Sequence, residues 1–506
     1  MTLAVFFRQE LLDNPYLTDI ILYLYFFSLL ILFAFGAHGF VMVYHYLKNR
    51  RPEEPLTMSG ELPVVTVQLP VFNEYYVVER LIQSVCAIEY PKEKLEVQVL
   101  DDSTDETVDI VEALVRDYQL LGYDIKHIRR PNRSGFKAGA LKAGLETARG
   151  EFIAIFDADF VPNTDFLLRT LPHFANARIG LVQTRWEHLN SEYSLLTRTQ
   201  AMALDGHFVM EQDVRNKVGY FINFNGTGGI WRKEAILDAG NWQSDTLTED
   251  LDLSYRAQLK GWQFKYLNDV TSPAELPSEV GALKSQQFRW TKGAIETARK
   301  MLPEVWKAKI PLRVKIHSTF HLTNNIVFPF ILLAGLLNVP LMFIKHRGGH
   351  EAYFAMMSIF VVAFIGSFLF YLLSQKAVYP DWRRRLLLFP LFMAGSMGFA
   401  VNNSRAVFEG LLRKKSEFIR TPKYRIQGKT DSWREKKYAP LKLHWVVLVE
   451  ILLAVYCFFG VISSLYYLEI AAVPFQLLYF LGFAFVSALS IKQAFEARKL
   501  RQHQQA

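Results

Sequence analysis

Three pairs of acidic residues occur in order along the chain, and each pair stands where an apolar segment ends or a helical segment begins. Carboxylates in such positions can act as oxygen ligands for a hard cation or as bases for a hydroxyl group. In open α/β sheets, residues just beyond the carboxyl ends of strands line the ligand-binding crevice. The three pairs are Asp101 with Asp102, Asp157 with Asp159, and Glu249 with Asp250.

The first two pairs each have a functional and a structural interpretation. Asp101 and Asp102 end an apolar strand, but Ser103 or Asp105 can also serve as the N-cap of the helical segment that follows. The pattern Asp157-Ala158-Asp159 can place two oxygens on one divalent cation together with phosphate oxygens. A turn would also explain that pattern, although its position directly after an apolar strand favours a function.

The third pair belongs to Thr248-Glu249-Asp250, which opens a helical segment running toward Gly261. Thr248 can be an N-cap, with the acids favouring the positive end of the helix. Because this pair follows the other two in order, a functional role is favoured for Glu249 and Asp250. Farther on, Gln286-Gln287-Phe288-Arg289-Trp290 combines an amide, a planar cation and an indole, which suit a diphosphate and the flat face of a sugar ring. The nearby lysines and arginines also fit an amphipathic helix on a membrane surface, and both interpretations are compatible.

These residues need a scaffold, and residues 52 to about 312 alternate between strand-like and amphipathic helical segments. This alternation predicts an α/β domain. Helices are expected over Glu106–Leu121 and Lys137–Ala148. The expected strands are Val64–Val71, Leu95–Leu100, Asp124–Ile128, Phe152–Phe156 and Gly180–Thr184.

The composition predicts that much of the chain contacts lipid. Hydrophobic residues make up 51% of the 506 residues, and phenylalanine alone contributes 40, which exceeds the usual balance of a soluble chain. The formal net charge is +8, and the basic residues cluster beside apolar runs, which indicates a membrane surface and no nucleic acid as partner. The two cysteines, Cys86 and Cys457, fit neither a disulfide framework nor a zinc site and are expected to be free thiols.

The first apolar run, Ile20–Tyr44, has no charged residue and is long enough to cross a bilayer. A cleaved signal peptide is the alternative, but the run exceeds the usual length and no small-residue cleavage site follows it. Lys48, Arg50 and Arg51 place the next segment in the cytosol.

Further apolar runs follow Lys315, at about 318–344, 352–375, 386–404, 445–467 and 470–491. The third of these follows Arg383–Arg385 and precedes residues 411–442, which hold eleven Lys and Arg against three Asp and Glu, so both its flanks are expected in the cytosol. We therefore expect 386–412 to lie along the membrane interface or to be re-entrant, which leaves five spans and a cytosolic C-terminal tail. Glu450 lies near the cytosolic end of its run, and snorkelling is favoured over contact with a polar cavity.

Taken together, the acidic motifs and Gln286-Gln287-Phe288-Arg289-Trp290 resemble the family 2 inverting glycosyltransferases of the GT-A fold, whose membrane branch shows D, D-x-D, T-E-D and Q-x-x-R-W in this order. The resemblance covers roughly residues 60 to 305 and is nearest to cellulose-synthase-like enzymes that make mannan, glucomannan or glucan, and more distantly to bacterial cellulose synthase. It includes the segments Pro70-Val71-Phe72-Asn73-Glu74, Lys137-Ala138-Gly139-Ala140-Leu141, Val182-Gln183-Thr184-Arg185-Trp186 and Phe224-Asn225-Gly226-Thr227-Gly228-Gly229.

For the donor, the resemblance implies that Asp102 with Asp101 contacts the nucleotide and that Lys137 contacts the diphosphate. Asp157 and Asp159 would hold Mg²⁺ or Mn²⁺ together with the diphosphate. Both UDP-glucose and GDP-mannose enzymes of the resembling family use these motifs, so the sequence leaves the donor open between them.

For the acceptor, the resemblance implies that Asp250, beside Glu249, removes the proton of the acceptor hydroxyl. Arg289 and Gln286 would steady the diphosphate, and Trp290 would stack on the acceptor sugar at the mouth of a channel. The segment that would line the acceptor site consists of Phe224, Asn225, Gly226 and Thr227.

The basic loop 413–442 contains Phe418-Ile419-Arg420-Thr421-Pro422-Lys423, which resembles the F-x-V-T-x-K gating loop that covers the nucleotide in cellulose synthases. The match rests on Phe418, Thr421 and Lys423, because Arg420 replaces the valine. The alternative is a basic loop that lies near anionic lipids.

The sequence thus predicts a cytosolic α/β GT-A (Rossmann-like) domain, residues 51–312, inserted between an N-terminal span within 1–50 and a transmembrane region over 313–506. We expect an integral membrane protein of a bacterial inner or plasma membrane, or of a eukaryotic Golgi or plasma membrane. The expected activity is processive elongation of a β-linked glucan or mannan, with export through the spans, alone or with accessory subunits or as a homo-oligomer. A single-transfer enzyme of the ceramide glucosyltransferase type is the alternative, and a transporter or scaffold with a degenerate domain is a further one.

Overall fold

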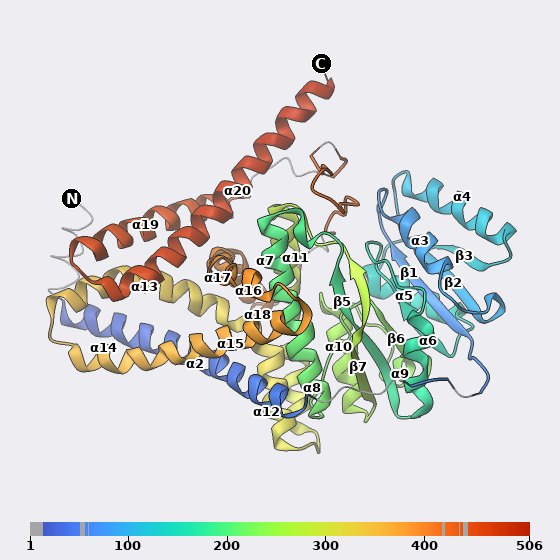
Figure 1. Cartoon of the computed structure of the whole chain (residues 1–506), viewed down its shortest axis with the longest axis horizontal. Helices are drawn as coiled ribbons and strands as arrows, with labels where there is room; N and C mark the ends of the chain where they lie inside the picture. Colours follow the sequence, from blue (N-terminus) through green and yellow to red (C-terminus); the bar gives the residue numbers. More distant parts are fainter. Residues whose placement is uncertain are drawn as a thin grey trace.

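The computed structural model describes residues 14–50, 56–58, 60–416, 420–434, 436–438 and 444–505, with side chains up to residue 499. One part is a mixed sheet with flanking helices, and the other is a group of long apolar helices that lie together beside it (Figure 1). Helix α11 (Val280–Lys307) runs between the two parts.

The sheet has seven strands in the order β3-β2-β1-β4-β6-β5-β7. Strands β3, β2, β1 and β4 are parallel neighbours, and β6 is antiparallel to both β4 and β5, whereas β5 and β7 are parallel to each other. The strands are β1 (Val65–Val71), β2 (Leu95–Asp101), β3 (Asp124–Arg129), β4 (Phe152–Ile155), β5 (Ile179–His188), β6 (Gly229–Arg232) and β7 (Gln263–Ala274).

Strand β4 shows why this sheet is buried on both faces. Because side chains alternate along a strand, Phe152 and Ala154 enter one apolar core, while Ile153 and Ile155 enter the other. The first core is covered by α3 (Val78–Cys86) and α4 (Thr107–Leu120). The second is covered by α5 (Phe136–Thr147), α9 (Lys233–Asp238) and α10 (Glu249–Leu259). Burial on both faces explains the near-continuous apolar runs in the central strands.

Shorter helices complete this part of the chain. Helix α6 (Phe166–Thr170) follows β4, and α7 (Leu195–Asp205) continues through a π-helix, η5 (Gly206–Gln212), into α8 (Asp213–Lys217). The five strands and two helices expected from the sequence are all present, with ends shifted by a few residues at most. Strands β6 and β7 were not predicted, because β6 is short and β7 carries Lys265, Asn268 and Asp269 among its apolar residues.

Within the described ranges, five helical segments are long and apolar enough to cross a membrane. The first is Pro15–Lys48, which is α2. The second, Leu312–Arg347, includes α12 (Leu312–Thr323) and α13 (Val327–Arg347), and the third, Glu351–Val378, includes α14 (Glu351–Met357) and α15 (Val361–Val378). The last two are Val446–Tyr466, which is α19, and Ile470–Lys499, which includes η8 (Ile470–Ala472) and most of α20 (Val473–Gln505). They coincide with the five spans expected from the sequence.

The segment expected at the membrane interface is broken in the structure. It consists of α16 (Trp382–Leu386), α17 (Phe389–Gly398) and α18 (Ala400–Leu411), and the axis bends by 46° between Gly398 and Ala400. Such a bend fits a broken span or a re-entrant segment, and its place at the interface stays a prediction.

Small residues allow the apolar helices to approach closely. A Cβ atom on Gly36 of α2 would lie 2.7 Å from Cβ of Ala363 in α15, and one on Gly366 would lie 2.8 Å from the Phe40 ring. Close backbone approach through small residues is a usual way for helices to associate in lipid. Cys86 and Cys457 are both free and buried, as expected.

Glu450 of α19 corrects one expectation. Its side chain is fully buried and pairs with Lys284 of α11 at 2.7 Å, so it does not snorkel toward the membrane surface. The sequence could not identify this partner, because the two residues lie on different helices that are distant along the chain.

Candidate active site

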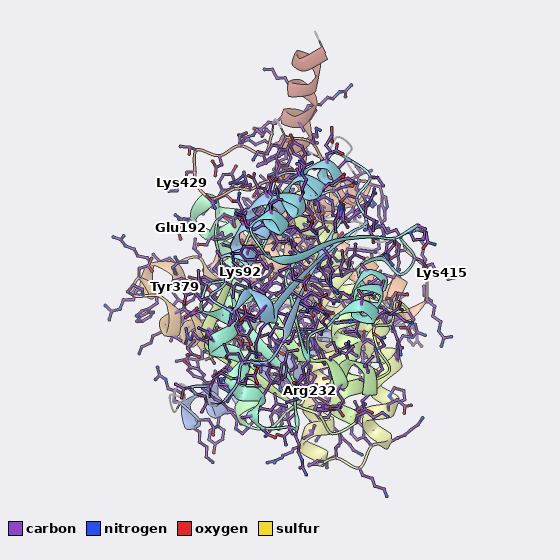
Figure 2. The ribbon with its side chains drawn as sticks, turned by 90° about the vertical axis from the view of Figure 1, so that its right-hand side faces the viewer. Lys92, Glu192, Arg232, Tyr379, Lys415 and Lys429 are labelled. Atoms are coloured by element: carbon purple, nitrogen blue, oxygen red, sulfur yellow. The ribbon has the colours of Figure 1, made fainter. Side chains whose placement is uncertain are left out.

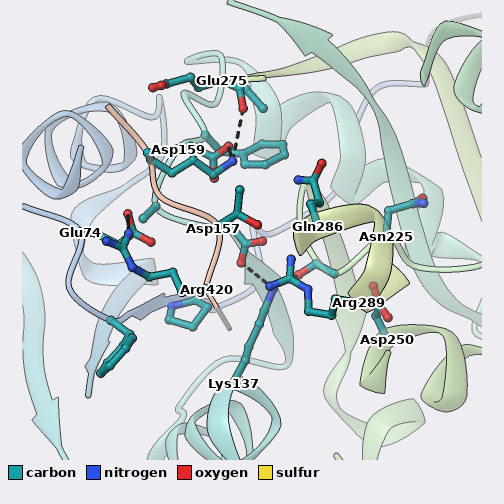
Figure 3. A pocket seen from close by; sticks show the side chains of 18 of the residues that line it. Glu74, Lys137, Asp157, Asp159, Asn225, Asp250, Glu275, Gln286, Arg289 and Arg420 are labelled. Atoms are coloured by element: carbon teal, nitrogen blue, oxygen red, sulfur yellow. Dashed lines mark hydrogen bonds and ion pairs between the residues drawn. The ribbon is translucent and has the colours of Figure 1, made fainter. Parts of the chain in front are cut away.

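A polar cavity opens at the carboxyl ends of β1, β2 and β4, where those strands run parallel (Figure 3). It is also lined from α5, α10 and α11 and from the loop after α18. The residues of the predicted site that line it are Asp102, Lys137, Asp157, Asp159, Asn225, Gly226, Glu249, Asp250, Gln286, Arg289, Trp290, Thr421 and Lys423. The sequence motifs therefore converge on one cavity, although they are spread over most of the chain.

Lys137 binds the first residue of the D-x-D motif. Its Nζ lies 2.5 Å from Asp157 Oδ1 and donates to the Gly226 carbonyl oxygen at 2.9 Å. Burial disfavours the ammonium form, but the charges of Asp157, Glu249 and Asp250 outweigh it and raise the pKa of Lys137. A fixed cation of this kind suits a bound diphosphate.

Gly139 explains the small residues that follow Lys137. A Cβ atom there would collide with the Ser134 carbonyl oxygen and would approach Arg130 Nη1 to 2.6 Å. Gly135, with φ of 72°, takes the left-handed conformation at the N-cap of α5. The two glycines let α5 begin close to the cavity, so that Lys137 in its first turn reaches Asp157.

Asp250 and Glu249 lie at the start of α10. Burial, and then the negative charge of Glu249, raise the pKa of Asp250 to about 7, and burial also raises the pKa of Glu249. A carboxyl group with this pKa can take up a proton near neutral pH. Thr248 occupies the N-cap position of α10, but its hydroxyl pairs with Thr297 at 3.1 Å, so side-chain capping does not explain this motif.

Helix α11 brings Gln286, Arg289 and Trp290 to the cavity, where the Arg289 side chain points toward Asp157 and Lys137 (Figure 3). Burial lowers the pKa of Arg289, while Glu249, Asp157 and Asp250 act in the opposite direction. The Trp290 ring lies 6.5 Å from the Trp186 ring, centre to centre. Trp290 also lines a second, largely apolar cavity together with Phe328, Phe392 and Phe485, so it stands between the polar cavity and the apolar helices.

The second residue of the D-x-D motif is held by the loop after α18. Lys423 Nζ lies 2.6 Å from Asp159 Oδ2 and donates to the Glu275 carbonyl oxygen at 3.2 Å. In the same loop, Arg420 pairs with Glu74 at 2.9 Å. Burial raises the pKa of Glu74 to about 7 even though Arg420 opposes it, and burial also raises the pKa of Glu275.

Arg420, Thr421 and Lys423 of this loop line the cavity. Seen from the side of the sheet, Lys415 and Lys429 lie at opposite margins of the molecule (Figure 2). Between them, Thr421 is buried and lines the cavity. Farther along the same loop, Lys437 forms an ion pair with Glu106 at 2.6 Å. Phe418, the first residue of the predicted loop motif, lies outside the described residues.

Three residues of the predicted site lie away from the cavity surface. Asp101 is 1% exposed, and its carboxylate accepts from the Ser103 amide at 2.8 Å and pairs with His127 at 2.9 Å. Phe224 packs in the second core, and Thr227 accepts from the Asp157 amide at 2.9 Å. Their contacts support the cavity wall. The sequence also allowed Ser103 or Asp105 to cap the next helix. Asp105 does accept from the Thr107 amide, in the first turn of that helix, at 3.0 Å.

Several cavity residues were not assigned from the sequence. Glu74 and Glu275 each supply a buried carboxylate, and Trp186 and His188 extend from β5. Glu275 follows β7, which the sequence did not reveal as a strand. Glu74 ends the segment Pro70-Val71-Phe72-Asn73-Glu74, and its position after β1, beside the strands that carry Asp102 and Asp157, was the signal that could have identified it.

The carboxylates fit a divalent cation only together with other ligands. No group of three or more His, Cys, Asp and Glu residues in the described ranges is arranged to hold a metal ion. Asp157 and Asp159 both face the cavity and offer hard oxygen donors, which suit Mg²⁺ or Mn²⁺ when phosphate oxygens complete the coordination. Each of these two carboxylates forms an ion pair with a lysine, so both already neutralise a positive charge at the position proposed for the cation.

Comparisons with known sequences match the same part of the chain. A family model described as "Glycosyltransferase like family 2" matches residues 63–293. The probable glucomannan 4-beta-mannosyltransferase 4 of Oryza sativa subsp. japonica is 45% identical over 281 residues, which are 54% of this chain and 51% of that protein. The glucomannan 4-beta-mannosyltransferase 2 of Arabidopsis thaliana is 46% identical over 256 residues, which are 50% of this chain and 48% of that protein. The chain therefore spans about half the length of the curated relatives it matches.

A solved structure shares the fold. The mannosyltransferase PcManGT from Pyrobaculum calidifontis, in complex with GDP-Man and Mn2+, matches with a TM-score of 0.54 and 19% sequence identity. The match covers 77% of this chain and 100% of that chain. At this identity the likeness shows the arrangement of the elements alone.

Proposed function

We propose that residues 63–293, which match the model of the family 2 glycosyltransferases, form a glycosyltransferase domain of the GT-A fold, and that the chain transfers a hexose from a nucleotide diphosphate-sugar to a growing β-linked polysaccharide of the glucan or mannan type. The observation that carries the proposal is the meeting of Asp250, whose pKa is raised to about 7, with Lys137 and Arg289 in one cavity. A base for a hydroxyl and cations for a leaving diphosphate are what this transfer needs.

The proposed reaction is a single in-line displacement. The acceptor hydroxyl oxygen bonds to the anomeric carbon of the donor sugar while the bond from that carbon to the diphosphate oxygen breaks. Asp250 takes the hydroxyl proton, and the nucleoside diphosphate leaves with the electron pair. Attack from the face opposite the leaving group inverts the anomeric configuration, which yields a β-linkage from an α-linked donor.

Charge on the leaving diphosphate is met by this chain's own cations. Lys137 and Arg289 both bring their charged ends near Asp157 in the cavity, and Gln286 adds an amide from the helix that carries Arg289 (Figure 3). A divalent cation held by Asp157 and Asp159 would neutralise further charge on the phosphate oxygens. With a cation on Asp157 and Asp159, the ammonium groups of Lys137 and Lys423 would be available to bind the phosphates.

Mannose is the sugar that the comparisons favour. Several relatives that are 42 to 46% identical are named as glucomannan 4-beta-mannosyltransferases, and the solved structure that shares the fold contains GDP-Man. We therefore propose GDP-mannose as the first donor to test, with UDP-glucose as the second. Mn²⁺ or Mg²⁺ is the proposed metal ion.

The cavities between the helices support a route for the product. The apolar cavity beyond Trp290 shares Ser396 with a third cavity, which is lined from α2, α13, α15, α17 and α20. We propose that Trp290 stacks on the acceptor sugar and that the growing chain passes along this row of cavities. The proposed orientation places the sheet domain, residues 51–312, in the cytosol, because basic residues follow the first span and precede α17.

A glycolipid product is the second candidate, because Phe328, Phe392 and Phe485 line the cavity beside Trp290 and would also suit an acyl chain. Product size separates the two candidates. A long polymer that a mannanase degrades supports polysaccharide elongation, whereas one sugar on a chloroform-soluble lipid supports the glycolipid candidate.

The deciding experiment uses detergent-purified protein with GDP-mannose or UDP-glucose and Mn²⁺ or Mg²⁺. Nucleotide release and sugar incorporation are measured together, with the Asp250→Asn variant as the blank and Asp245→Asn as its matched control. Asp245 lies outside the cavity and pairs with Lys300 at 2.8 Å. Release of no nucleotide from either donor by the unchanged protein would overturn the proposal and would favour a transporter or scaffold. Copurifying proteins and the mass of the complex would identify accessory subunits or a homo-oligomer.

A further inference from the structure

The π-helix η5 carries three polar side chains that the proposed reaction does not use directly. π-Helical turns inside α-helices are rare and occur frequently at functional sites. Gly206 begins η5, and a Cβ atom there would lie 2.6 Å from the ring of Tyr371. From η5, His207 and Gln212 reach the loop that precedes β6, while Glu211 joins His207 to Arg215.

Asn225 is the residue of that loop on which these side chains meet. Gln212 Nε2 lies 2.7 Å from both the Asn223 carbonyl oxygen and Asn225 Oδ1. Asn225 Nδ2 lies 3.0 Å from His207 Nε2, and His207 Nδ1 lies 3.0 Å from Glu211 Oε2. The last contact of this hydrogen-bond network joins Arg215 Nη2 to Glu211 Oε1 at 2.9 Å.

The hydrogen-bond donors and acceptors of this network have one consistent assignment. The Asn223 carbonyl oxygen can only accept, so Gln212 Nε2 donates both of its hydrogens, and Asn225 Oδ1 accepts the second one. Asn225 Nδ2 therefore faces His207 Nε2 and donates to it. His207 then carries its hydrogen on Nδ1 and donates to the Glu211 carboxylate, which fixes its tautomer.

Glu211 holds its end of the hydrogen-bond network as an ionised carboxylate. Burial alone would raise its pKa, but Arg215 and the bond from His207 outweigh burial and hold the pKa of Glu211 well below its usual range. Arg215 is itself 1% exposed, whereas the Glu211 side chain is 20% exposed and lines the cavity between the apolar helices.

The same loop is held from a second direction. Tyr255 of α10 donates its hydroxyl to His321 Nδ1 at 2.8 Å, and His321 Nε2 donates to Asn223 Oδ1 at 3.2 Å. His321 belongs to α12, at the start of the second apolar segment. The loop is thus fixed between η5 and the apolar helices.

Gly226 transmits this placement to the reacting groups. It follows Asn225 directly, and its carbonyl oxygen accepts from Lys137. A Cβ atom on Gly226 would lie 3.0 Å from Asp250 Oδ2, so the loop backbone lies against the proposed base. A shift of Asn225 therefore moves the surface on which an acceptor hydroxyl would approach Asp250.

We infer that His207 and Glu211 are positioning residues that fix Asn225 and, through it, the acceptor side of the cavity. This inference rests on the proposed function, because it assigns the network to acceptor delivery in that reaction. The donor side meets this loop where Lys137 donates to the Gly226 carbonyl oxygen, and its acidic residues are held by separate contacts, from Lys137 to Asp157 and from Lys423 to Asp159. Loss of His207 therefore weakens acceptor use and leaves donor binding intact.

The test compares His207→Leu with His207→Gln in the whole 506-residue chain in detergent, using GDP-mannose with Mn²⁺ and manno-oligosaccharide acceptors. Loss of one hydrogen bond at the loop should raise the acceptor KM by about tenfold in His207→Leu, with the donor KM within about twofold of the unchanged protein. The fraction of released nucleotide that is matched by transferred sugar should fall. Glutamine can accept from Asn225 and donate to Glu211, so His207→Gln should recover most of the loss.

Asn225→Asp provides a second variant of nearly the same shape. A carboxylate there still accepts from Gln212 but cannot donate to His207, so the acceptor KM should rise as in His207→Leu. His444→Leu is the matched histidine control, since His444 contacts Arg405 away from the cavity. Equal changes in donor and acceptor KM, or an unchanged acceptor KM in Asn225→Asp, would overturn the inference. Failure of the unchanged protein to release nucleotide from any donor would instead overturn the proposed function.

Discussion

Lys284 of α11 and Glu450 of α19 form a buried ion pair, with 2.7 Å between Lys284 Nζ and Glu450 Oε2. Lys284 also donates to Ser490 Oγ of α20 at 3.0 Å. Helix α11 carries Gln286 and Arg289 into the cavity within the next two turns, so this pair fixes the cavity wall to the apolar helices.

Removal of one partner should destabilise the protein strongly. Lys284→Met leaves the Glu450 carboxylate buried without its cation, which typically costs about 3 to 5 kcal/mol. The double variant Lys284→Met/Glu450→Leu replaces the pair by apolar side chains and should recover most of that loss. Thermal unfolding in detergent measures both, with Lys307→Met as an exposed control on the same helix. Additive effects in the double variant would contradict a direct coupling.

The domain was predictable from its sequence because its central strands are apolar and end in acidic residues. The runs before Asp102 and Asp157 identify β2 and β4, and the α/β alternation then places their carboxyl ends at one edge. Strand β7 escaped prediction because Lys265, Asn268 and Asp269 interrupt its apolar residues, and Glu275, which follows it, was missed with it.

Long-range pairs could not be predicted in this way. Lys423 and Asp159 are 264 residues apart, and nothing in either segment specifies the other. Nothing in the residue types of η5 specifies a π-helix, so the wider turn that aims His207 and Gln212 at Asn225 depends on packing and not on the local sequence. These contacts depend on the tertiary structure.

The transfer rate should depend on the ionisation of Asp250. Only the carboxylate can take the hydroxyl proton, so kcat/KM should fall as the pH drops below about 7, the raised pKa of Asp250. Glu249→Gln removes a negative charge that contributes to this raised value, and the acid limb should therefore move to lower pH. The pH dependence of kcat/KM with saturating metal ion measures this. A limb that stays in place would assign it to another group, such as Glu74, whose pKa burial also raises to about 7.

Removal of divalent cations should abolish transfer. Chelation with EDTA removes the positive charge that Asp157 and Asp159 would hold against the diphosphate, and added Mn²⁺ or Mg²⁺ should restore activity. Asp159→Asn should raise the Mn²⁺ concentration for half-maximal activity by at least about tenfold, because one charged ligand is lost. Asp165→Asn is the control, since Asp165 pairs with Arg169 outside the cavity. Full activity in EDTA would exclude a metal requirement.

Lys423 should contribute to donor binding. When Asp159 is occupied by a cation, the Lys423 ammonium is free to bind the diphosphate, and a charge-assisted hydrogen bond of this kind contributes about 1.5 to 3 kcal/mol. Lys423→Met should therefore raise the donor KM by about tenfold or more, with the acceptor KM unchanged. Lys429→Met, an exposed position in the same loop, should leave both constants unchanged. A lower donor KM in Lys423→Met would mean that the loop obstructs the donor site.

Gly226 and Gly219 form a matched pair that separates backbone strain from contact with the reacting groups. Both glycines have left-handed φ angles, 80° for Gly226 and 74° for Gly219, so alanine costs about 1 kcal/mol of backbone strain at either position. A Cβ atom on Gly226 would also lie 3.0 Å from Asp250 Oδ2 and 3.3 Å from Lys137 Nζ. On Gly219 it would meet no heavy atom of the described chain within 4 Å.

Both alanine variants should therefore lose similar stability in thermal unfolding, but only one should lose activity. In Gly226→Ala the methyl group occupies the space beside Asp250 where the acceptor hydroxyl must approach, and kcat should fall by about 100-fold or more, since small displacements of reacting groups have effects of that size. Gly219→Ala should keep nearly the full kcat. Equal losses of activity in the two variants would show that strain alone decides the outcome, and would remove Gly226 from the acceptor side of the site.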